Sequence, residues 1–548
     1  MPITEFLERN AREYEDETSL IEINPEALDD GELSWKEYTL VEVAHVHGYR
    51  KTMTWGEFDR KANQTANLLK SRGFSKGDKV ALLLMNCIEW LPIYFGILKS
   101  GATVVPLNYR YTAEEIKYCL GLADVSALIF GEEFVERMEA IIGTIPEVRN
   151  IFYVGSEKPG FAESYEDASS AMPEDAPGIS LSDEEDAAIY YSSGTTGFPK
   201  AILHPHANLV SACVTEQKHH GQTRDDIFLC IPPLYHTGAK MHWFGSLVSG
   251  SKAVILRGVN PKWILDAASR EGASIVWLLV PWAQDILDAI ECGEVELGDY
   301  DLKKWRLMHI GAQPVPPSLI KRWFHYFPDH QYDTNYGLSE SIGPGAVHLG
   351  VENISKVGAI GKAGHGWRTK IIDEAGAPVK RGDVGELAVS GPGVMKCYYN
   401  DEEATGAVLK DGWLHTGDMA REDEDGFIYL VDRKKDVIIS GGENIYPVQI
   451  EDFLRKFEKV KDVAVIGLPH HRLGEIAAAI VELKPDRESS EEEILQFSME
   501  LPRYKRPRQV IFDKVPRNPT GKIEKPKLRE KYAGGSVVEL QIEGDKRA

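Results

Sequence analysis

The stretch Ser192-Ser193-Gly194-Thr195-Thr196-Gly197-Phe198-Pro199-Lys200 follows directly on the apolar run Ala188-Ile189-Tyr190-Tyr191. The apolar run predicts a strand, and the residues after it are typical of a loop. Glycines let a backbone turn tightly and approach a ligand, so that successive N–H groups can converge on phosphate oxygens. Four hydroxyl side chains add hydrogen-bonding groups, and Lys200 adds a cation. The stretch therefore predicts a phosphate-binding loop, with a hairpin turn that binds no ligand as the alternative.

The residues after Lys200 distinguish this loop from a Walker A loop. A Walker A lysine is followed by Ser or Thr and then by a helix. Here Lys200 leads into Ala201-Ile202-Leu203, which predicts a second strand, and His204-Pro205-His206 ends it. The loop is thus expected to join two strands.

The composition is that of an ordinary globular protein, with 43% hydrophobic and 27% charged residues. A chain of 548 residues is too long for one compact core, so a large body and at least one further domain are expected. The net charge of -23 argues against general nucleic-acid binding. The segment from Leu501 to Tyr532 is locally basic, which fits either a solvated surface or a partner for polyphosphate ligands.

The cysteine pattern and the length of the apolar runs indicate the cellular location of the protein. The six cysteines are scattered, with no CxxC and no His/Cys metal spacing, which fits a reducing cytoplasm and speaks against structural zinc. The N-terminal residues show no signal-peptide pattern, and the longest apolar runs are too short to span a bilayer. A cytoplasmic protein without a transmembrane segment is expected.

Strands and helices alternate along the first half of the chain. Thr54-Trp55-Gly56-Glu57 predicts a capping box that opens a helix, and a strand is expected at Val80–Met85. Thr112-Ala113-Glu114-Glu115 opens another helix, followed by a strand at Ser126–Phe130. This alternation predicts βαβ units and a mostly parallel sheet covered on both faces. A similar rhythm returns between Ile227 and Ile310, so more than one such layer is expected, although no internal repeat is apparent.

The pattern changes later in the chain. Residues 155–186 are rich in Gly, Pro, Ser and acids and predict an exposed connection, and Gly358–Phe427 predicts a small β-rich subdomain. The predicted fold class is α/β: a large N-terminal domain of layered βαβ sheets with that subdomain (residues 1–432), followed by a smaller mobile α+β C-terminal domain (residues 433–548). The boundary is placed at Asp432–Lys435.

Tyr191–Lys200 resembles, almost residue for residue, the signature loop of the adenylate-forming superfamily: acyl-CoA synthetases, free-standing adenylation domains and firefly-type luciferases. Further blocks resemble the family in the family's order across residues 50–530. The resemblance implies an AMP-forming acyl-CoA synthetase, an acid–thiol ligase that makes acyl-CoA, AMP and pyrophosphate from a carboxylic acid, ATP and coenzyme A through an acyl-adenylate. It implies that ATP or AMP binds at Ser192, Ser193, Gly194, Thr195, Thr196, Gly197 and Lys200.

Asn335-Tyr336-Gly337-Leu338-Ser339-Glu340 resembles a nucleotide-binding block that ends in Thr-Glu in most relatives. By that resemblance, the nucleotide contacts include Asn335, Tyr336, Gly337 and Ser339, with the Tyr336 ring stacked on adenine and Ser339 at the α-phosphate. Glu340 is expected to hold Mg²⁺, and a carboxylate beside phosphates suits this ion, which shares its ligands with substrate phosphates. The Ser in place of Thr keeps the hydroxyl group.

Two further blocks complete the nucleotide site by resemblance. Gly311-Ala312-Gln313-Pro314 matches the adenine-side turn, with Gln313 as a mild departure from the usual Ala or Glu. Gly412–Asp418 is a close match, and Asp418 is expected to accept hydrogen bonds from both ribose hydroxyls. A buried capping aspartate is the alternative for Asp418.

Asp432–Asp436 and the Gly441-Gly442 pair that follows resemble the family's hinge and the start of its mobile domain. Arg433 is expected to contact ribose, and Lys435 occupies the hinge position, where a loop residue absorbs a large backbone change. Gly441 and Gly442 lack side chains, so the pantetheine arm of coenzyme A can pass close to the backbone. An ordinary β-turn is the alternative.

Lys522, in Pro519-Thr520-Gly521-Lys522-Ile523, matches the family's catalytic lysine. Attack of a carboxylate on an α-phosphate joins two anions, and a preorganised cation lowers that barrier. An isolated surface lysine is the alternative. Lys522, Glu340 and His236 are the predicted catalytic residues.

The acid-binding region is expected around Pro232–Gly238, which matches the family block before the acid-binding helix. His236 is expected near the carboxylate and the pantetheine entrance, or as a packing histidine. Trp243 and Phe244 can line a pocket or fill a core. Asn335 stands where many relatives have Gly, and its side chain is expected to shorten an acyl tunnel. The predicted acid is therefore medium-chain, alicyclic or aromatic.

Several alternatives stay open at this point. They are an acyl-AMP ligase that loads a carrier protein, a luciferase-like oxygenase, a long-chain fatty-acid CoA ligase and a non-catalytic nucleotide-binding protein. The absence of a carrier domain after Lys522 favours coenzyme A as the acceptor, and the presence of Lys200, Glu340, Asp418 and Arg433 argues against a non-catalytic protein. The acidic segment Ile23–Tyr49 has no assigned role, and a homodimer contact is one interpretation of it.

Overall fold

The computed structural model describes residues 1–25, 48–192, 199–311, 315–343, 345–350, 353–440, 443–485, 487–517 and 523–533. The chain forms two compact units. The first contains Met1–Thr369 and Val389–Leu414, and the second contains Lys370–Ala388 and His415–Ala548. The chain therefore passes between the units more than once.

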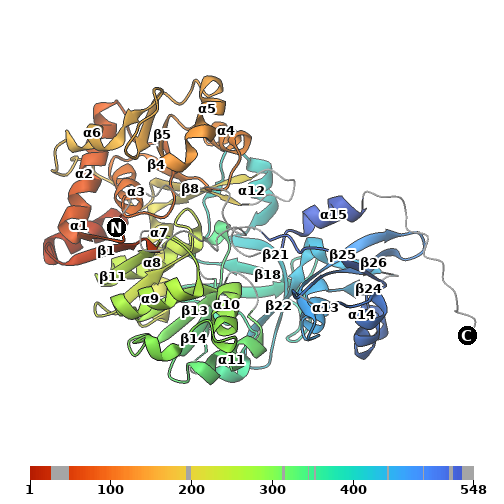
Figure 1. The fold of residues 1–548 in the computed structure, drawn as a ribbon. Helices are drawn as coiled ribbons and strands as arrows, with labels where there is room; N and C mark the ends of the chain where they lie inside the picture. The colour runs from red at the N-terminus through yellow and green to blue at the C-terminus, as the bar shows by residue number, and fades with distance from the viewer. Residues whose placement is uncertain are drawn as a thin grey trace, which may run out of the picture. The chain divides into compact units, whose positions relative to one another are not determined.

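The first unit contains a nine-stranded sheet (Figure 1). Its strand order is β16-β15-β14-β13-β12-β10-β11-β1-β2. The strands from β14 to β1 run parallel to one another, while β2, β15 and β16 are each antiparallel to a neighbour. Their bounds are Thr18–Ile23 (β1), Arg50–Thr54 (β2), Ile227–Cys230 (β10), Lys252–Leu256 (β11), Ile275–Leu279 (β12), Leu307–Gly311 (β13), Gln331–Tyr336 (β14), Ala346–Leu349 (β15) and Lys362–Ala363 (β16).

An eight-stranded sheet lies in the same unit, with the order β19-β9-β8-β4-β3-β5-β6-β7. The strands from β8 to β7 are parallel, and β9 pairs antiparallel with both β8 and β19. Their bounds are Lys79–Leu83 (β3), Thr103–Pro106 (β4), Ala127–Gly131 (β5), Asn150–Val154 (β6), Glu163–Ser164 (β7), Asp186–Ser192 (β8), Lys200–Pro205 (β9) and Cys397–Tyr398 (β19).

The two sheets share one topology over most of their width. The run β14-β13-β12-β10-β11-β1-β2 corresponds to β7-β6-β5-β3-β4-β8-β9. In both runs every neighbouring pair is parallel except the last, which is an antiparallel hairpin. The first unit therefore contains an internal structural repeat that the sequence did not reveal.

Helices cover both faces of the eight-stranded sheet (Figure 1). On β3, Val80 and Leu82 join the core that contains α2 and α3, while Ala81 and Leu83 join the core that contains α4 and α5. This alternation is expected for a parallel strand buried on both faces. The helices of the first unit are α1 Thr4–Glu13, α2 Trp55–Ser71, α3 Trp90–Lys99, α4 Ala113–Leu122, α5 Val135–Ile141, α6 Tyr165–Ser170, α7 His206–His219, α8 Thr237–Ser249, α9 Pro261–Glu271, α10 Val280–Glu291, α11 Pro317–Tyr326 and α12 Glu402–Val408.

An aromatic cluster joins the helices that cover the two sheets. Trp243 of α8 contacts the rings of Phe58 in α2 and Phe95 in α3, and Phe244 contacts Tyr94. Trp243 and Phe244 are fully buried in the same core. Both side chains therefore fill a core, which was one of the two interpretations left open by the sequence.

Two five-stranded sheets complete the chain. One has the order β17-β18-β21-β20 with β22 beside β21, and the other has the order β24-β23-β26-β25 with β27 beside β26. Alternate residues of β25 enter separate cores, Val463 and Val465 in one and Ala464 and Ile466 in the other. The bounds are β17 Arg368–Ile372, β18 Gly385–Ser390, β20 Leu409–Lys410, β21 Trp413–Glu422, β22 Ile428–Arg433, β23 Ile438–Ser440, β24 Glu443–Ile445, α13 Pro447–Leu454, β25 Val460–His470, β26 Gly474–Leu483, α14 Glu491–Phe497, β27 Gln509–Phe512 and α15 Lys525–Ala533.

The predicted α/β fold class is confirmed, and so are both capping boxes, at Thr54 and at Thr112. Residues 155–186, predicted to form an exposed connection, are mostly exposed but are not irregular throughout. The segment contains β7 and α6, and the buried Tyr165 hydroxyl lies 2.6 Å from the Thr65 hydroxyl. Because the segment is rich in turn-forming residues, the buried contact of Tyr165 could not be predicted from its composition.

The compact units do not follow the predicted division into residues 1–432 and 433–548. The predicted division separates a static body from a domain that moves during the reaction. Packing within each compact unit does not test whether that domain moves. The division stays a prediction.

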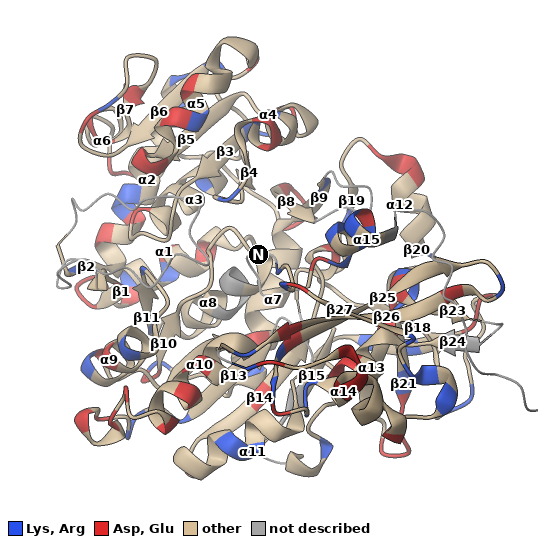
Figure 2. Ribbon diagram, turned by 45° about the vertical axis from the view of Figure 1, so that its right-hand side comes forward, with Lys and Arg blue, Asp and Glu red and all other residues tan. Residues whose placement is uncertain are grey.

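Acidic and basic residues are interspersed along the helices (Figure 2). The helix α15 carries Lys525, Lys527, Arg529 and Lys531, within the segment that the sequence marks as basic. None of the helices in the described part of the chain is long and apolar enough to cross a membrane.

Candidate active site

The predicted phosphate loop joins two antiparallel strands of the eight-stranded sheet. Ser192 ends β8 and pairs in register with Lys200, the first residue of β9. The expected strand–loop–strand arrangement is therefore present, because the intervening residues connect a hairpin. Ser193, Gly194, Thr195, Thr196 and Gly197 lie outside the described residues, so their roles stay predictions.

Lys200 and Glu340 lie on opposite sides of one tyrosine. The Lys200 Nζ lies 4.7 Å from the centre of the Tyr398 ring, and the Tyr398 hydroxyl donates to Glu340 Oε1 at 2.9 Å. A cation over an aromatic face is an attractive contact. The structure thus brings together the predicted phosphate-binding cation and the predicted Mg²⁺ ligand.

Tyr398 was not among the residues singled out from the sequence. Burial and the Glu340 carboxylate raise the pKa of Tyr398 well above its usual range, so the phenol stays protonated and continues to donate. Tyr398 lies in β19, an edge strand that pairs with β9 far from it in the chain. The short run Cys397-Tyr398-Tyr399 gives no motif from which this contact could have been predicted.

A buried histidine positions Ser339. His204, in β9, has Nε2 2.9 Å from the Ser339 carbonyl oxygen, and the Asn208 amide lies 2.9 Å from His204 Nδ1. The carbonyl can only accept, so Nε2 carries the proton and Nδ1 accepts from the amide. A neutral histidine in one tautomer therefore anchors the turn Ser339–Ser341 that carries Glu340.

The adenine-side residues end neighbouring parallel strands of the nine-stranded sheet. Gly311 ends β13 and Tyr336 ends β14, and Tyr336 is 7% exposed. Gly337 follows directly, while Ala312 and Gln313 lie outside the described residues. Ligands of open α/β sheets bind at the carboxyl ends of strands, so Gly311 and Tyr336 stand where a nucleotide is expected.

Asn335 faces a buried carboxylate. Its amide nitrogen donates to Glu216 of α7, a residue that is almost fully buried. The Asn335 side chain is thus held against α7. Its predicted contact with the nucleotide stays a prediction, and its predicted effect on an acyl tunnel is taken up below.

His236 is the N-cap of α8. Its Nδ1 accepts a hydrogen bond from the Gly238 backbone N–H at 3.1 Å, and its side chain is half-buried. The tautomer is therefore fixed with the proton on Nε2. His236 has both a capping role and an accessible ring edge, so neither of its two sequence interpretations is excluded.

Trp277 of β12 fills the space beside the start of α8. A Cβ atom added to Gly238 would lie 2.8 Å from the Trp277 ring, and the ring centres of Trp277 and His309 are 6.1 Å apart. Gly238 is therefore required by the close approach of the indole. Sequence analysis did not single out Trp277.

The predicted ribose contacts lie together in the second unit. Asp418 of β21 and Arg433 of β22 are register partners, with Arg433 Nε 3.2 Å from Asp418 Oδ1. Asp418 is buried, and its backbone N–H donates to the Thr416 hydroxyl. Lys435 is exposed and lies in the turn Lys434–Asp436, in which Asp436 is buried.

Lys522, Gly441 and Gly442 lie outside the described residues. The catalytic role of Lys522 and the pantetheine path along the two glycines stay predictions.

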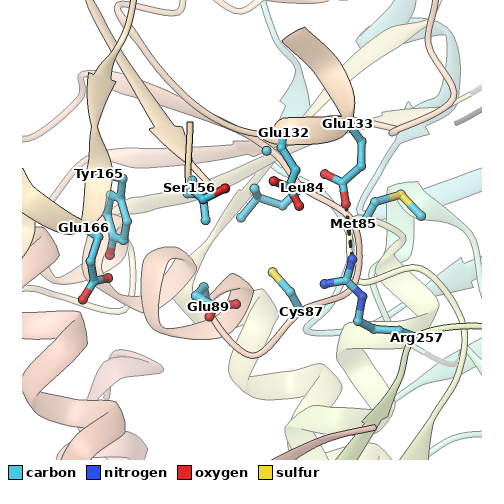
Figure 3. Close-up of a pocket in the computed structure, with 13 residues that line it drawn as sticks. Leu84, Met85, Cys87, Glu89, Glu132, Glu133, Ser156, Tyr165, Glu166 and Arg257 are labelled. Carbon is cyan, nitrogen blue, oxygen red and sulfur yellow. Dashed lines mark hydrogen bonds and ion pairs between the residues drawn. The ribbon is translucent and has the colours of Figure 1, made fainter. Parts of the chain in front are cut away.

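A separate cavity of about 200 Å³ lies at the carboxyl ends of β3, β5 and β6 (Figure 3). Glu132 and Glu133 line it, and Arg257 pairs with Glu133 at 3.2 Å. Burial raises the pKa of Glu22, whose fully buried carboxylate lies 3.9 Å from Arg257. Four glutamates and one arginine line the cavity, so its charged groups do not suit the phosphates of ATP or coenzyme A, and none of the predicted site residues lines it.

The fold and the strand-end site define an adenylate-forming enzyme, and comparisons with known proteins agree. The AMP-binding enzyme family matches residues 9–399, and the family of its C-terminal domain matches residues 449–522. The chain therefore belongs to the AMP-binding enzyme family.

Individual relatives carry the comparison further. The chain is 32% identical over 489 residues to the long-chain-fatty-acid–CoA ligase FadD13 of Mycobacterium tuberculosis, covering 88% of this chain and 93% of that one. It is 32% identical over 484 residues to a feruloyl-CoA synthase of Amycolatopsis sp., covering 88% and 94%. The solved structure of the anthranilate CoA ligase AuaEII with anthranoyl-AMP matches with a TM-score of 0.84 and 25% identity, covering 97% of both chains. The predicted reaction class, an AMP-forming acid–thiol ligase that binds ATP and AMP, is thereby confirmed.

Proposed function

We propose that this ligase joins a compact apolar acid, aromatic, alicyclic or medium-chain, to coenzyme A through an acyl-adenylate. The observation that carries the proposal is the close approach of Trp277 to the start of α8. The Trp277 indole occupies the position beside Gly238, and no side chain fits between them.

The polar residues near this position also disfavour a long chain. Asn335 donates to the buried Glu216, and His309 lies against Trp277. An alkyl chain that displaced these contacts would leave buried polar groups without hydrogen bonds. Each such group costs about 1–3 kcal/mol. Relatives named for ferulate and anthranilate support an aromatic acid, while the relative named for long-chain fatty acids supports the alternative.

Magnesium fits the carboxylate of Glu340. This half-buried group accepts one hydrogen bond from Tyr398, and an ionised carboxylate has capacity for several more contacts. When bound, Mg²⁺ supplies charge neutralisation at the phosphates. Glu340 then orients the ion, Tyr398 orients Glu340, and Lys200 adds a further positive charge.

The two half-reactions require different arrangements of the C-terminal domain, residues 433–548. Lys522 is proposed to stabilise the α-phosphate and the acid carboxylate during adenylation, with Asp418 and Arg433 at the ribose. Rotation about Lys435 then withdraws Lys522 and presents Gly441 and Gly442 to coenzyme A. Such closure positions reactants and excludes water from the adenylate. Cytoplasmic location is part of the proposal, and the six unpaired cysteines fit it.

A Lys522→Ala variant tests the catalytic assignment. We expect ATP–pyrophosphate exchange to be lost, with much of the thioester formation from supplied acyl-adenylate retained. The matched control is Lys527→Ala, which removes an exposed lysine paired with Glu524. Exchange at the wild-type rate in Lys522→Ala would refute the role of Lys522.

A panel of acids with coenzyme A tests the acid class. Benzoate, cyclohexanecarboxylate, octanoate and hexadecanoate are compared by pyrophosphate release, and we expect hexadecanoate to give the lowest kcat/KM. Trp277→Ala should raise the relative kcat/KM for the longer acids. A wild-type preference for hexadecanoate would instead favour a long-chain ligase.

The same assay distinguishes the acceptor. Replacing coenzyme A with a phosphopantetheinylated carrier protein should leave AMP release at its background rate. Faster release with the carrier than with coenzyme A would support carrier loading.

A further inference from the structure

Four side chains with metal-binding groups meet between α7 and the nine-stranded sheet. Glu216 and His220 come from the C-terminal end of α7, His309 from β13 and Asp333 from β14. Their side chains are only 2%, 0%, 1% and 3% exposed, respectively. The ligand atoms of Glu216, His220 and His309 all lie within 4.8 Å of one another.

The distances around His220 Nε2 match those between the ligands of a tetrahedral ion. This atom lies 3.2 Å from Glu216 Oε2, 3.3 Å from Asp333 Oδ2 and 3.2 Å from His309 Nδ1. Zinc binds nitrogen and oxygen at about 2.0–2.2 Å, so the edges of its coordination tetrahedron are about 3.3 Å long. These three distances share His220 Nε2 and have the length of such an edge, which is also the length of an ordinary hydrogen bond or ion pair. Asp333 lies outside the set whose ligand atoms are all within 4.8 Å of one another, so its carboxylate would move to complete the tetrahedron.

One distance is shorter. His309 Nδ1 lies 2.5 Å from Asp333 Oδ1, which is a hydrogen bond through one shared proton. Metal binding would release this proton to solvent, as it does for other histidine ligands, and the two groups would separate by less than about 1 Å.

Both carboxylates of the cluster have histidine partners within 3.3 Å, and a divalent cation would compensate their charge without protonated histidines. Glu216 and Asp333 place two carboxylates in one buried cluster, and such groups need positive partners. Arg306 donates to the His220 carbonyl oxygen at 3.0 Å, but its guanidinium is engaged with Asp226 at 2.8 Å. A divalent ion balances both carboxylates at once.

The surroundings and the donor types narrow the choice of ion. Asn335 donates to Glu216, and a hydrogen bond of this kind orients a ligating carboxylate. Imidazole nitrogens suit first-row transition ions, whereas Mg²⁺ and Ca²⁺ prefer oxygen donors. The sequence argument against structural zinc rested on cysteine content and on local His/Cys spacing, and neither detects ligands that come from separate elements.

We propose that Glu216, His220, His309 and Asp333 bind one Zn²⁺ ion that fastens α7 to β13 and β14. The site is distinct from the Mg²⁺ site proposed at Glu340. Zinc here would fix the strands that end at Gly311 and Tyr336, while taking no part in the chemistry of the acid. The proposal does not depend on which acid or thiol the enzyme uses.

The metal content of the purified enzyme tests this directly. Full-length protein without a histidine tag is produced in zinc-supplemented medium, passed through gel filtration with EDTA, and measured by mass spectrometry. We expect about one Zn²⁺ per chain, released to a chromogenic chelator only on denaturation. In protein produced with Co²⁺, we expect the visible absorption of a tetrahedral cobalt site.

Variants locate the ion. His220→Gln and Asp333→Asn should retain less than a tenth of the wild-type zinc. His206→Gln is the matched control, because His206 is an equally buried histidine on the same helix and outside the cluster. It should retain the full amount.

Wild-type protein without zinc, and without a tetrahedral spectrum after growth with cobalt, would overturn the proposal and leave a hydrogen-bonded cluster only. Zinc retained in full by both cluster variants would also overturn it. If a variant does not fold, the wild-type content and the cobalt spectrum still decide.

Discussion

The two large sheets of the first unit have the same strand order and direction over seven strands, yet their carboxyl edges carry different chemistry. The nine-stranded sheet ends at Gly311 and Tyr336, beside the predicted nucleotide block. The eight-stranded sheet ends at Glu132 and Glu133, around an acidic cavity that contains Arg257. In open α/β sheets a crevice forms where the strand order reverses. The two sheets thus share a topology, and side chains decide what each carboxyl edge does.

The hairpins at the ends of the two runs also differ, in the residues that connect their strands. β8 and β9 are joined by the predicted phosphate loop, whereas β1 and β2 are joined by residues 24–49, most of which form the acidic segment without an assigned role. Equivalent connections in the repeat thus differ in length and in charge. The predictions below test whether the acidic cavity serves stability while the carboxyl edge of the nine-stranded sheet serves catalysis.

Replacing Arg257 by Ala should have the largest effect. Arg257 lies between Glu133 and the fully buried Glu22, and removing it leaves buried carboxylates without their cation. We expect the free energy of unfolding to fall by roughly 3–5 kcal/mol, measured by urea denaturation. Arg270→Ala is the control, because Arg270 forms an exposed pair with Asp266 and should cost at most about 1 kcal/mol. Equal losses in the two variants would contradict a structural role for the acidic cavity.

The next effect concerns two glutamates, each of which follows a strand of one of the two sheets. Glu340→Gln should lower ATP–pyrophosphate exchange by roughly 10²–10³-fold, because the proposed Mg²⁺ ligand loses its charge. Glu132→Gln, after β5, should change the exchange rate by less than about twofold. A similar loss of exchange in both variants would show that the acidic cavity takes part in catalysis.

Buried histidines near the two sheets should make stability depend on pH. Burial lowers the pKa of His206, after β9, and of His330, before β14, from 6.5 to about 4. The unfolded chain takes up these protons first, so the stability present above pH 6.5 is lost as the pH falls towards 4. Each group should contribute roughly 3 kcal/mol to the loss.

Urea denaturation between pH 4 and 7 measures this loss in His206→Gln and His330→Gln. Each variant should show a shallower fall in stability than the wild type. Unchanged slopes in both variants would show that the histidines are protonated in the folded protein over this range.

The smallest effect is expected for Tyr398→Phe. The variant loses the hydrogen bond to Glu340, and we expect ATP–pyrophosphate exchange to fall by roughly tenfold, with a higher Mg²⁺ requirement. Tyr399→Phe is the control, since the neighbouring hydroxyl binds the exposed Asp124. Equal exchange rates in the two variants would show that Tyr398 is not part of the site.

Local signals predicted much of this fold. The capping boxes at Thr54 and Thr112 depend on residues three positions apart. Buried parallel strands are recognisable in the sequence as short apolar runs. The reaction class followed from a loop whose resemblance to a family is specific. Tyr398, Trp277 and the Glu216 cluster could not be predicted, because their partners come from distant elements. The repeat of the two sheets was hidden for a related reason, since strand order depends on pairing and not on local composition.

The position of β1 has a consequence for synthesis of the chain. β1 ends at Ile23, whereas its parallel partner β11 begins only at Lys252, so β1 is made long before β11. At roughly 5–20 residues per second, the ribosome reaches β11 on the order of ten to fifty seconds after it has made β1. Until then β2 is the only neighbouring strand of β1 in this sheet that has been made, so one edge of β1 stays unpaired in the nascent chain.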